Sequence, residues 1–383
     1  TDAGANAAGE AARPNSHRQK QGEMAGQCIA FERLVKHEEL GRGAFGAVYR
    51  ATLDGERVVV VKQLHAASEE AASLLLKEGA VMWRLPAHEN VLAYIGFCEQ
   101  PLALVSEYMR DGCLHDHLLE HADDITAAQA SGWVVGVARG LAHLHRSDVL
   151  HNDLAARNLL LAGDIVKVAD FGLSRSVQEY YYAGEGAEVP VRWSAPEVLQ
   201  RRKLSKAGDV WAFGVTCWEI FELGALPYFE IQLNSKVISH VVGGGRLARP
   251  KALPIADQLW VLVQSCWEST AKARPTMQAL EPLVVRVAAE FVMCKSKDDG
   301  ADGGFDVGIY ANSPALVTEA VENAAQLTAA DVGMYANMPA QVLEAALARD
   351  GPEQGGAREG GPRTARYSNI PPNLAAEDFA EPR

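Results

Sequence analysis

The chain has 383 residues, of which 48% are hydrophobic, so it is long enough to bury a substantial core. Its formal net charge of −13 argues against a nucleic-acid-binding protein, because such proteins neutralise phosphates with basic side chains. The sequence contains no apolar run of about 18 residues, no secretory leader after Thr1, and no cysteine spacing typical of zinc sites or disulfide frameworks. We therefore expect reduced thiols and a cytoplasmic setting.

Composition divides the chain into three parts. Residues 1–33 are polar and rich in Ala, Gly and Gln, which predicts a disordered segment, juxtamembrane if the protein is a receptor. Residues 34–293 have the patterns of a folded domain. Residues 294–383 are predicted to be an acidic, mostly disordered tail, since 14 Asp and Glu oppose 5 Lys and Arg from residue 298 onward.

The folded part begins with strand patterns. Leu40 to Leu53 and the run 58–61 flank the turn Asp54-Gly55, which is the signal of a β-hairpin. A helix is predicted over about Ser68 to Leu85, followed by two further strands around Val91–Phe97 and Leu102–Glu107.

Long helical patterns dominate after Leu118, such as Ala127–Ser147 and Asp209–Leu223. The order of elements predicts an α+β fold with a small β-rich lobe containing one key helix and a larger α-helical lobe.

A glycine motif lies in the first hairpin. Gly41, Gly43 and Gly46 precede Val48, and glycines at this spacing let main-chain N–H groups approach phosphates. A strand follows the motif instead of a helix, which disfavours a dinucleotide-binding fold. Taken alone, such a motif is often only a turn.

A lysine and a glutamate form the next candidate pair. Lys62 ends an apolar strand, and Glu78 lies on the following helix on the same side as Leu74, Leu75 and Met82. An unpaired carboxylate on a core-facing stripe would be costly, so we expect Glu78 to pair with Lys62. A lone lysine at this position would more simply reach solvent.

The most specific segment is His-Asn-Asp-Leu-Ala-Ala-Arg-Asn, residues 151–158. Asp153 could take the proton of an attacking hydroxyl, while Asn158 and Asp170 of the later Asp-Phe-Gly segment offer oxygen ligands that suit Mg²⁺. The segment closes at Ala-Pro-Glu, residues 195–197.

In this order and spacing, the motifs resemble those of the protein kinase family across about residues 34–293. The resemblance implies the bilobal kinase fold, ATP and Mg²⁺ as cofactors, and metal ligands at Asn158 and Asp170. It implies catalytic roles for Asp153, Lys62, Glu78, Arg157 and Asn158. The ATP-binding residues that it implies are Leu40, Gly41, Gly43, Phe45, Gly46, Val48, Val60, Lys62, Ser106, Glu107 and Met109.

The resemblance also implies structural roles. Met82, His151 and Phe171 resemble members of the hydrophobic spine that the family anchors on an aspartate, here Asp209. Glu197 is expected to pair with Arg274 and to brace the larger lobe.

Tyrosine is the expected substrate residue. Ala155 stands where serine/threonine kinases usually carry Lys, Arg157 stands where tyrosine kinases carry Arg, and Pro190–Trp193 resembles their platform for the phenol ring. Leu-Ala-Ala-Arg-Asn resembles the receptor-type motif, so the chain would be the cytoplasmic part of a plasma-membrane receptor if that motif is decisive.

Two positions depart from the family pattern. Asn152 replaces the Arg that grips a phosphate on the activation loop, which carries Tyr180, Tyr181 and Tyr182 as expected phosphorylation sites. We therefore expect a smaller activation on autophosphorylation than in relatives with Arg. Val60 replaces the usual Ala and narrows the adenine slot.

The tail carries a repeat. Residues 306–320 recur at 331–345, which gives Tyr-Ala-Asn at Tyr310 and Tyr335, and a third Tyr-x-Asn at Tyr367. Phosphorylated, these resemble ligands of Src-homology-2 adaptor proteins. The alternative is a pair of duplicated short helices.

The main interpretation is a protein tyrosine kinase that phosphorylates tyrosines of protein substrates and its own activation-loop and tail tyrosines, with a dimer formed for trans-autophosphorylation. A pseudokinase or phosphotyrosine scaffold with weak catalysis is the alternative of a different class, supported by Asn152 and Val60. A serine/threonine or dual-specificity enzyme is disfavoured by Ala155.

Overall fold

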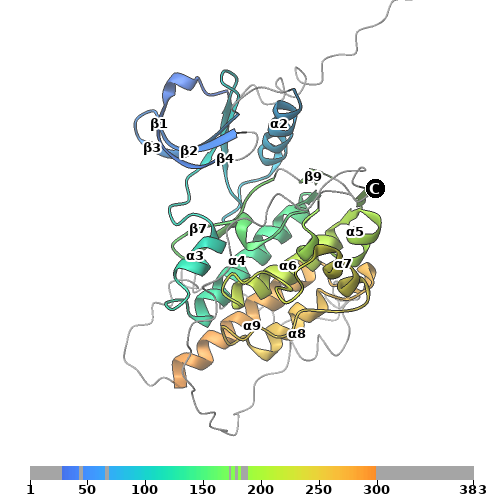
Figure 1. The fold of residues 1–383 in the computed structure, drawn as a ribbon. Coiled ribbons are helices and arrows are strands. Elements are labelled where there is room, and N and C mark those ends of the chain that lie inside the picture. Colours follow the sequence, from blue (N-terminus) through green and yellow to red (C-terminus); the bar gives the residue numbers. More distant parts are fainter. Residues whose placement is uncertain are drawn as a thin grey trace, which may run out of the picture. The chain divides into compact units, whose positions relative to one another are not determined.

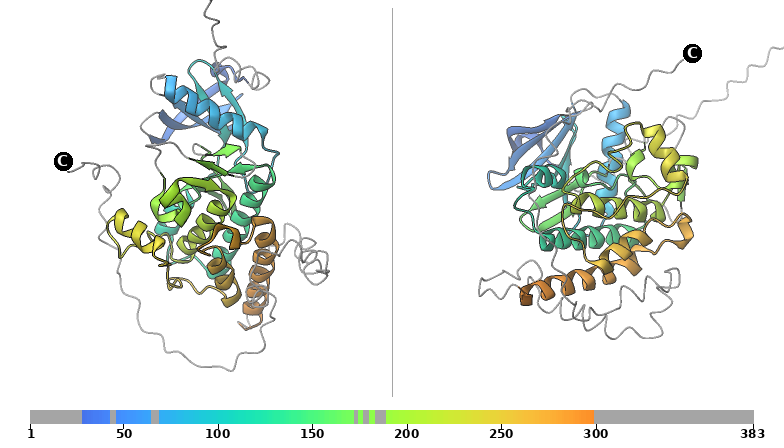
Figure 2. Two further views of the ribbon diagram at one scale, coloured as in Figure 1. Left: turned by 90° about the vertical axis from the view of Figure 1, so that its right-hand side faces the viewer. Right: turned by 60° about the horizontal axis from the view of Figure 1, so that its bottom comes forward.

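A computed structural model of the protein describes residues 28–42, 46–64, 69–171, 174–176, 180–182 and 189–298. A β-sheet lobe with one helix precedes a helical lobe, which confirms the expected α+β bilobal fold (Figure 1). The two further views in Figure 2 show α2 beside the sheet and the longer helices gathered in the other lobe.

The first lobe contains a five-stranded antiparallel sheet with strand order β1-β2-β3-β5-β4. Its elements are β1 (Leu34–Arg42), β2 (Gly46–Leu53), β3 (Arg57–Leu64), α2 (Glu69–Arg84), β4 (Tyr94–Cys98) and β5 (Ala103–Glu107). The predicted hairpin is confirmed: Leu53 pairs with Arg57, and the turn places Asp54 and Gly55 at φ 54° and 76°, the left-handed region that Gly adopts easily.

Alternation along β3 gives the sheet two different faces. Val59 and Val61 are fully buried in one apolar cluster with Ala51 and Val105. Val60 and Lys62 lie on the opposite face, because successive strand residues alternate. A smaller cluster of Leu75, Phe97 and Leu104 packs α2 against β4 and β5.

The second lobe is built around two long helices, α4 and α6. The chain enters it through α3 (Leu114–Glu120), α4 (Ala127–Arg146), β6 (Val149–Leu150), the 3-10 turn η3 (Ala156–Asn158), β7 (Leu159–Ala162), β8 (Ile165–Val168), β9 (Arg175–Ser176) and β10 (Tyr180–Tyr182). It continues through η4 (Val191–Trp193), α5 (Pro196–Arg201), β11 (Lys203–Ser205), α6 (Lys206–Phe221), α7 (Asn234–Val242), α8 (Asp257–Ser265), η5 (Ala271–Ala273) and α9 (Met277–Asp298).

Side-chain caps fix where the two central helices begin. Thr126 and Gln129 form a capping box at the start of α4, and Ser205 Oγ accepts the Gly208 N–H at the start of α6. Both helices then run through one large apolar core. Trp133 of α4 and Trp211 of α6 are almost completely buried in it, so the helices provide a rigid base for the loops above them.

The segment after α2 is fastened to the second lobe. Asn90 O accepts the Val168 N–H at 2.9 Å, and the Asn90 side chain donates to Val166 O at 3.0 Å. Gly140 of α4 lies so close that a methyl group there would overlap the main-chain oxygen of Asn90. This joint between the lobes therefore requires glycine.

Several boundaries differ from expectation. Residues 28–33, expected to be disordered, contain the 3-10 turn η2 (Phe31–Arg33), and Ile29 is buried against the sheet with its N–H bonded to Phe97 O at 2.8 Å. β1 starts at Leu34 instead of Leu40, and α9 continues to Asp298. Residues 1–27 and 299–383 lie outside the described part.

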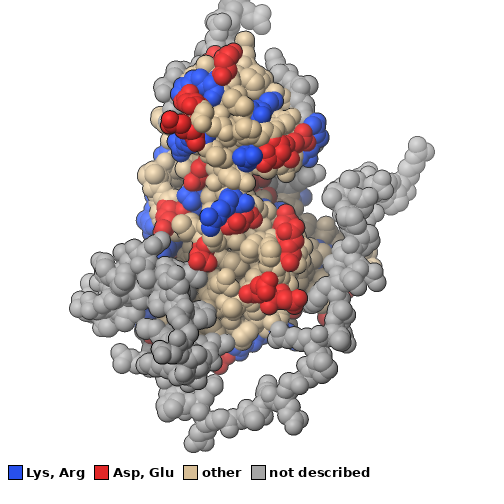
Figure 3. Space-filling model, turned by 90° about the vertical axis from the view of Figure 1, so that its left-hand side faces the viewer, with Lys and Arg blue, Asp and Glu red and all other residues tan. Residues whose placement is uncertain are grey.

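Charges of both signs lie side by side on the face of the first lobe drawn in Figure 3, instead of forming a broad patch of one sign. The ion pairs Arg33–Asp54 and Arg50–Glu38 belong to this lobe. Among the described helices, none has the length and apolarity needed to cross a bilayer.

Candidate active site

The predicted Lys62–Glu78 pair is formed between β3 and α2. Lys62 Nζ donates to both Glu78 oxygens, at 2.9 and 2.8 Å. Burial lowers the pKa of Lys62, but the charges of Glu78 and Asp170 outweigh it and hold the pKa above its ordinary value. Lys62 therefore stays protonated at neutral pH. Its side chain is 41% exposed, so the ammonium remains within reach of a ligand between the lobes.

The segment His151–Asn158, named the catalytic loop here after its expected role, is held by Asp209 of α6. Its two oxygens accept the N–H groups of His151 and Asn152, both at 2.8 Å, and His145 Nε2 lies 3.1 Å away. These bonds fix the loop while Asn152 adopts φ 66°, a left-handed conformation that Asn tolerates better than most residues.

The polar centre of the loop is Asp153 with Arg157 and Asn158. Arg157 pairs with one Asp153 oxygen, and Asn158 Nδ2 donates to the other at 2.9 Å and to the Asp153 carbonyl at 2.7 Å. Burial raises the pKa of Asp153, while the charges of Arg157 and His151 work against that rise. The carboxyl is thus oriented from two sides.

Asn158 and Asp170 fit the predicted magnesium site by their chemistry. Because both Asn158 amide hydrogens are directed to Asp153, its Oδ1 is the atom left for a cation. Asp170 is exposed, and its charge acts on Lys62, Glu78 and Asp153, so it lies among the groups of both lobes. Among the described residues, no group of three or more His, Cys, Asp or Glu is placed to hold a metal ion by itself, and Mg²⁺ shared with phosphates does not need one.

The neighbours of Asp170 form the expected apolar stack. The rings of His151 and Phe171 lie 5.8 Å apart, His151 donates from Nε2 to Ala169 O at 2.9 Å, and Met82 belongs to the same core. The expected brace is present as well: Arg274 donates to both oxygens of Glu197 at 2.8 Å.

The predicted adenine segment joins the lobes. The Glu107 carboxylate accepts the Ala93 N–H at 2.6 Å and pairs with Lys167 at 2.8 Å, and its main-chain N–H donates to Ala93 O at 3.1 Å, so both the side chain and the main chain fix this segment. Ser106 pairs with Val60 across the sheet, and Met109 is buried. Val48 and Leu40 lie on β2 and β1.

The platform segment η4 is fastened on two sides. Arg192 is buried and donates to the carbonyls of Pro227, Tyr228, Ile231 and Gln232 at 2.7–3.2 Å. Trp193 Nε1 donates to Glu219 at 2.6 Å. Arg192 lies within the platform predicted from the sequence, Pro190–Trp193, whereas Glu219 is not among the predicted site residues, although a lone charge in the apolar stretch 210–221 of α6 is a usable signal.

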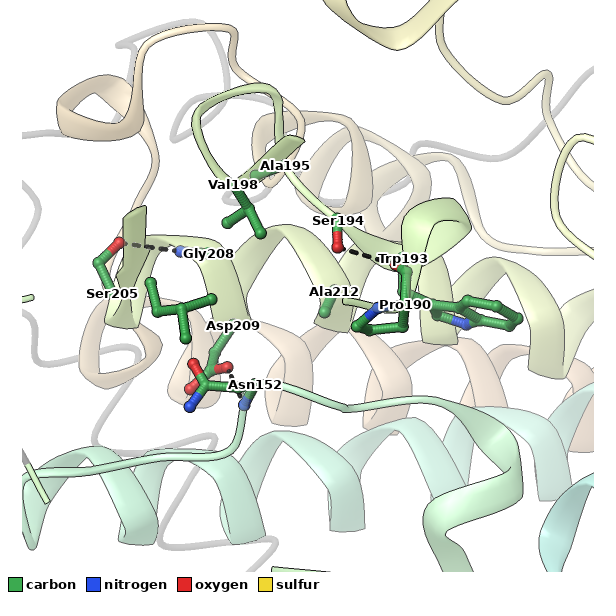
Figure 4. Close-up of a pocket in the computed structure, with 11 residues that line it drawn as sticks. Asn152, Pro190, Trp193, Ser194, Ala195, Val198, Ser205, Gly208, Asp209 and Ala212 are labelled. Carbon is green, nitrogen blue, oxygen red and sulfur yellow. Dashed lines mark hydrogen bonds between the residues drawn. The ribbon is translucent and has the colours of Figure 1, made fainter. Parts of the chain in front are cut away.

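A small pocket of about 20 Å³ lies between this platform and the catalytic loop (Figure 4). Asn152 and Asp209 lie on one side of it, Val198 and Ala195 on another, and Ser205 next to Gly208. At that volume the pocket holds about one water molecule, so it is not a nucleotide site.

Some predicted residues cannot be compared with the structure. Gly43 and Phe45 of the glycine motif lie outside the described residues, as do Tyr310, Tyr335 and Tyr367. Tyr180–Tyr182 are described as strand β10, which pairs antiparallel with β11.

Comparisons with known proteins agree with this geometry. The protein tyrosine and serine/threonine kinase family matches residues 34–284. The cytoplasmic tyrosine-protein kinase BMX of Mus musculus is 37% identical over 262 residues, which are 66% of this chain and 39% of that protein. The tyrosine-protein kinase TXK of Mus musculus is 35% identical over 255 residues, 66% of this chain and 47% of that protein.

The relatives do not support the receptor expectation. Ephrin type-A receptor 5 of Gallus gallus is 36% identical over 264 residues, 66% of this chain and 25% of that protein, no more than the cytoplasmic kinases. The chain spans less than half the length of these relatives. By its motifs, fold and relatives, this chain belongs to the protein tyrosine kinase family.

Proposed function

We propose that this chain transfers the γ-phosphate of ATP, with Mg²⁺, to tyrosine hydroxyls of protein substrates. The observation that carries the proposal is the convergence of Lys62, paired with Glu78, on one side and Asp153, oriented by Asn158 and Arg157, on the other. The charge of Asp170 acts on both groups.

Each side chain has a definite task in the transfer. Lys62, kept protonated by Glu78, neutralises charge on the ATP phosphates. Asp153 accepts the proton of the tyrosine hydroxyl as its oxygen attacks the γ-phosphorus and the bond to the leaving ADP oxygen breaks. Burial moves the pKa of Asp153 upward, toward the pH of the reaction, and such a pKa suits a general base. Magnesium supplies charge neutralisation when bound, and Asn158 Oδ1 and the Asp170 carboxylate would hold it.

The decisive test is transfer from Mg–ATP to a Glu/Tyr polymer, followed by phosphoamino-acid analysis. We expect phosphotyrosine from the wild-type chain and none from Asp153→Asn. Asp148→Asn is the matched control. Asp148 follows the end of α4 and pairs with Lys206, so we expect this substitution to leave activity unchanged. Phosphoserine as the main product would overturn the tyrosine assignment, and ATP binding without transfer would favour a scaffold.

Control by the activation loop is the next proposal. Asn152 shares its pocket with Leu204 and Ser205 of β11, the strand that pairs with Tyr180–Tyr182. This main-chain pairing supports a loop that docks without a phosphate–arginine contact, so autophosphorylation has a small effect. Comparing the activation ratio of the wild type with that of Asn152→Arg tests it, since an unchanged ratio would contradict the idea.

The tail and the location complete the proposal. Tyr310, Tyr335 and Tyr367 are proposed autophosphorylation sites that bind Src-homology-2 adaptors, with transfer between two copies of the chain. Phosphopeptides of each site, compared with Tyr→Phe peptides, would test binding. A cytoplasmic location is proposed from the relatives named cytoplasmic, and cell fractionation would test it.

A further inference from the structure

Glu219 is a buried carboxylate beneath the catalytic loop that the mechanism above does not use. Glu219 is only 2% exposed, and it is the single charged residue between Val210 and Phe221 of α6. Burying a carboxylate in an apolar helix is costly unless hydrogen bonds compensate it. A leucine would fill the same space without that cost, so the contacts of Glu219 need an explanation.

Those contacts join two parts of the active site. Glu219 Oε2 accepts the Trp193 indole N–H at 2.6 Å and the Ala156 main-chain N–H at 3.1 Å. Trp193 belongs to the platform η4, and Ala156 lies in the catalytic loop between Asp153 and Arg157. One oxygen atom therefore holds both segments at a fixed separation.

The connection continues to Asp153 through Arg157. The Arg157 guanidinium lies over the Trp193 ring, with its central carbon 4.4 Å from the ring centre, and the same guanidinium pairs with Asp153. Such stacking restricts the guanidinium to one orientation. A shift of Trp193 would move Arg157 relative to the Asp153 carboxylate.

We propose that Glu219 is a positioning residue for phosphate transfer, which holds Trp193 against the catalytic loop so that Arg157 keeps Asp153 aimed at the tyrosine hydroxyl. The inference rests on the proposed kinase function. It differs from the role of Asp209, which binds the other end of the loop at His151 and Asn152.

The electrostatics agree with this role. Burial raises the pKa of Glu219 to about 7, while the bonds from Trp193 and Ala156 favour the ionised form. The charged groups whose fields reach it are Arg157 and Asp153, both in the catalytic loop. Ionisation of Glu219 is thus coupled to the groups that it positions.

Paired substitutions test the proposal by kcat and KM with a tyrosine peptide. Trp193→Phe keeps a ring under Arg157 but removes the N–H donor, and we expect kcat to fall roughly tenfold with the KM for ATP unchanged. Trp218→Phe is the control. It removes an indole hydrogen bond of the same kind, which Trp218 of α6 donates to Ala248 O at 2.8 Å. We expect its kcat to stay within twofold of the wild type.

Glu219 itself is changed in two ways. Glu219→Leu removes the acceptor, and we expect a loss at least equal to that of Trp193→Phe. Glu219→Gln keeps an oxygen acceptor, so we expect kcat within about threefold of the wild type. The matched control is Glu222→Gln, because Glu222 also accepts two N–H groups, but they belong to Lys251 and Ala252, outside the catalytic loop.

The double variant Glu219→Leu with Trp193→Phe decides between the outcomes. Residues that act through one link give non-additive losses, so we expect the double variant to lose no more than Glu219→Leu alone. Losses that multiply, or a Trp193→Phe kcat equal to that of Trp218→Phe, would overturn the inference. If Glu219→Leu does not fold, the Trp193→Phe and Glu219→Gln comparisons still decide.

The wild-type assay separates this inference from the function on which it rests. A wild-type chain that transfers no phosphate would overturn the proposed kinase activity, and the positioning role with it. A working wild type with unaffected Trp193 and Glu219 variants would overturn the positioning role alone.

Discussion

The two lobes hold their principal ion pairs in opposite ways. In the sheet lobe, Lys62 is 41% exposed and Glu78 is its partner in the described contacts. In the helical lobe, the Arg274 side chain is completely buried, and besides Glu197 it donates to the carbonyls of Ala207 and Glu268. The first arrangement leaves a charge available to a ligand, while the second uses four of the five guanidinium N–H donors for the fold.

The largest effect is expected where the buried pair is broken. Arg274→Leu leaves Glu197 and two carbonyls without their donor, so the free energy of unfolding should fall by about 3–5 kcal/mol. Chemical denaturation of the wild type and of Arg274→Leu measures this difference in the free energy of unfolding. Arg249→Leu breaks the exposed pair with Asp257 and one bond to the Ile255 carbonyl, and it should change stability by only about 1 kcal/mol. Equal losses in the two variants would contradict the comparison.

Breaking the Lys62–Glu78 pair should lower the rate of phosphate transfer and leave the stability of the fold nearly unchanged. Lys62→Met removes the cation expected to neutralise the phosphates, and transfer should fall roughly 100-fold or more. Stability should change little, because Glu78, whose pKa burial already raises, can take up a proton. Lys36→Met, on the exposed strand β1, is the control for transfer and melting alike. A large fall in the melting temperature of Lys62→Met would contradict this difference between the two ion pairs.

Glu219 sharpens the comparison, because it is buried but bonded to neutral donors. Its pKa of about 7 lies above the ordinary 4.5, so the folded state keeps a proton that the unfolded chain releases. Its contribution to stability is full below pH 4.5 and is lost as pH rises to about 7, by up to about 3 kcal/mol.

The measurement is urea unfolding of the wild type and Glu219→Gln at pH 5 and pH 8. The stability of the wild type relative to the variant should be lower at pH 8. A flat difference for Glu219→Gln would show that its pKa is not raised.

The smallest effect concerns the face of β3 that carries Lys62. Val60 lies two residues before Lys62 on that face and is half-buried. Val60→Ala should lower the KM for ATP about fivefold, which corresponds to about 1 kcal/mol. Val58→Ala makes the same change at an exposed position of the same strand and should leave the KM unchanged. An unchanged or higher KM in Val60→Ala would mean that the slot has adjusted to valine.

Much of the fold and site could be predicted from local patterns. The Asp54-Gly55 turn predicted the hairpin, and a carboxylate on a core-facing helix stripe predicted the Lys62–Glu78 pair. The same reasoning applied to Glu219 would have predicted a buried partner, but a helix that is apolar on all sides gives no face along which to look for it.

Other features are not visible in local patterns. β1 is an edge strand, and all of its residues after Leu34 are exposed. Its sequence therefore lacks the alternation of apolar residues that marks a strand, and the predicted start at Leu40 was too late. The contact of Gly140 with Asn90 joins residues far apart in sequence, and a glycine does not disturb helical periodicity. Ile29 lies in a run of only four apolar residues, Cys28–Phe31, next to a polar segment, and so short a run does not predict burial against the sheet.

The joint at Asn90 has a mechanical consequence. The main-chain groups of Asn90 and Leu92 are both bonded to Val168, and Gly140 leaves no space between Asn90 and α4. A motion that opens the space between the lobes must therefore be a rotation about this point and not a translation of the sheet. Atoms near Asp170, two residues after Val168, would be displaced least, and the hairpin of β1 and β2 most. Nucleotide could then enter and leave while the metal-binding end of the site keeps its geometry.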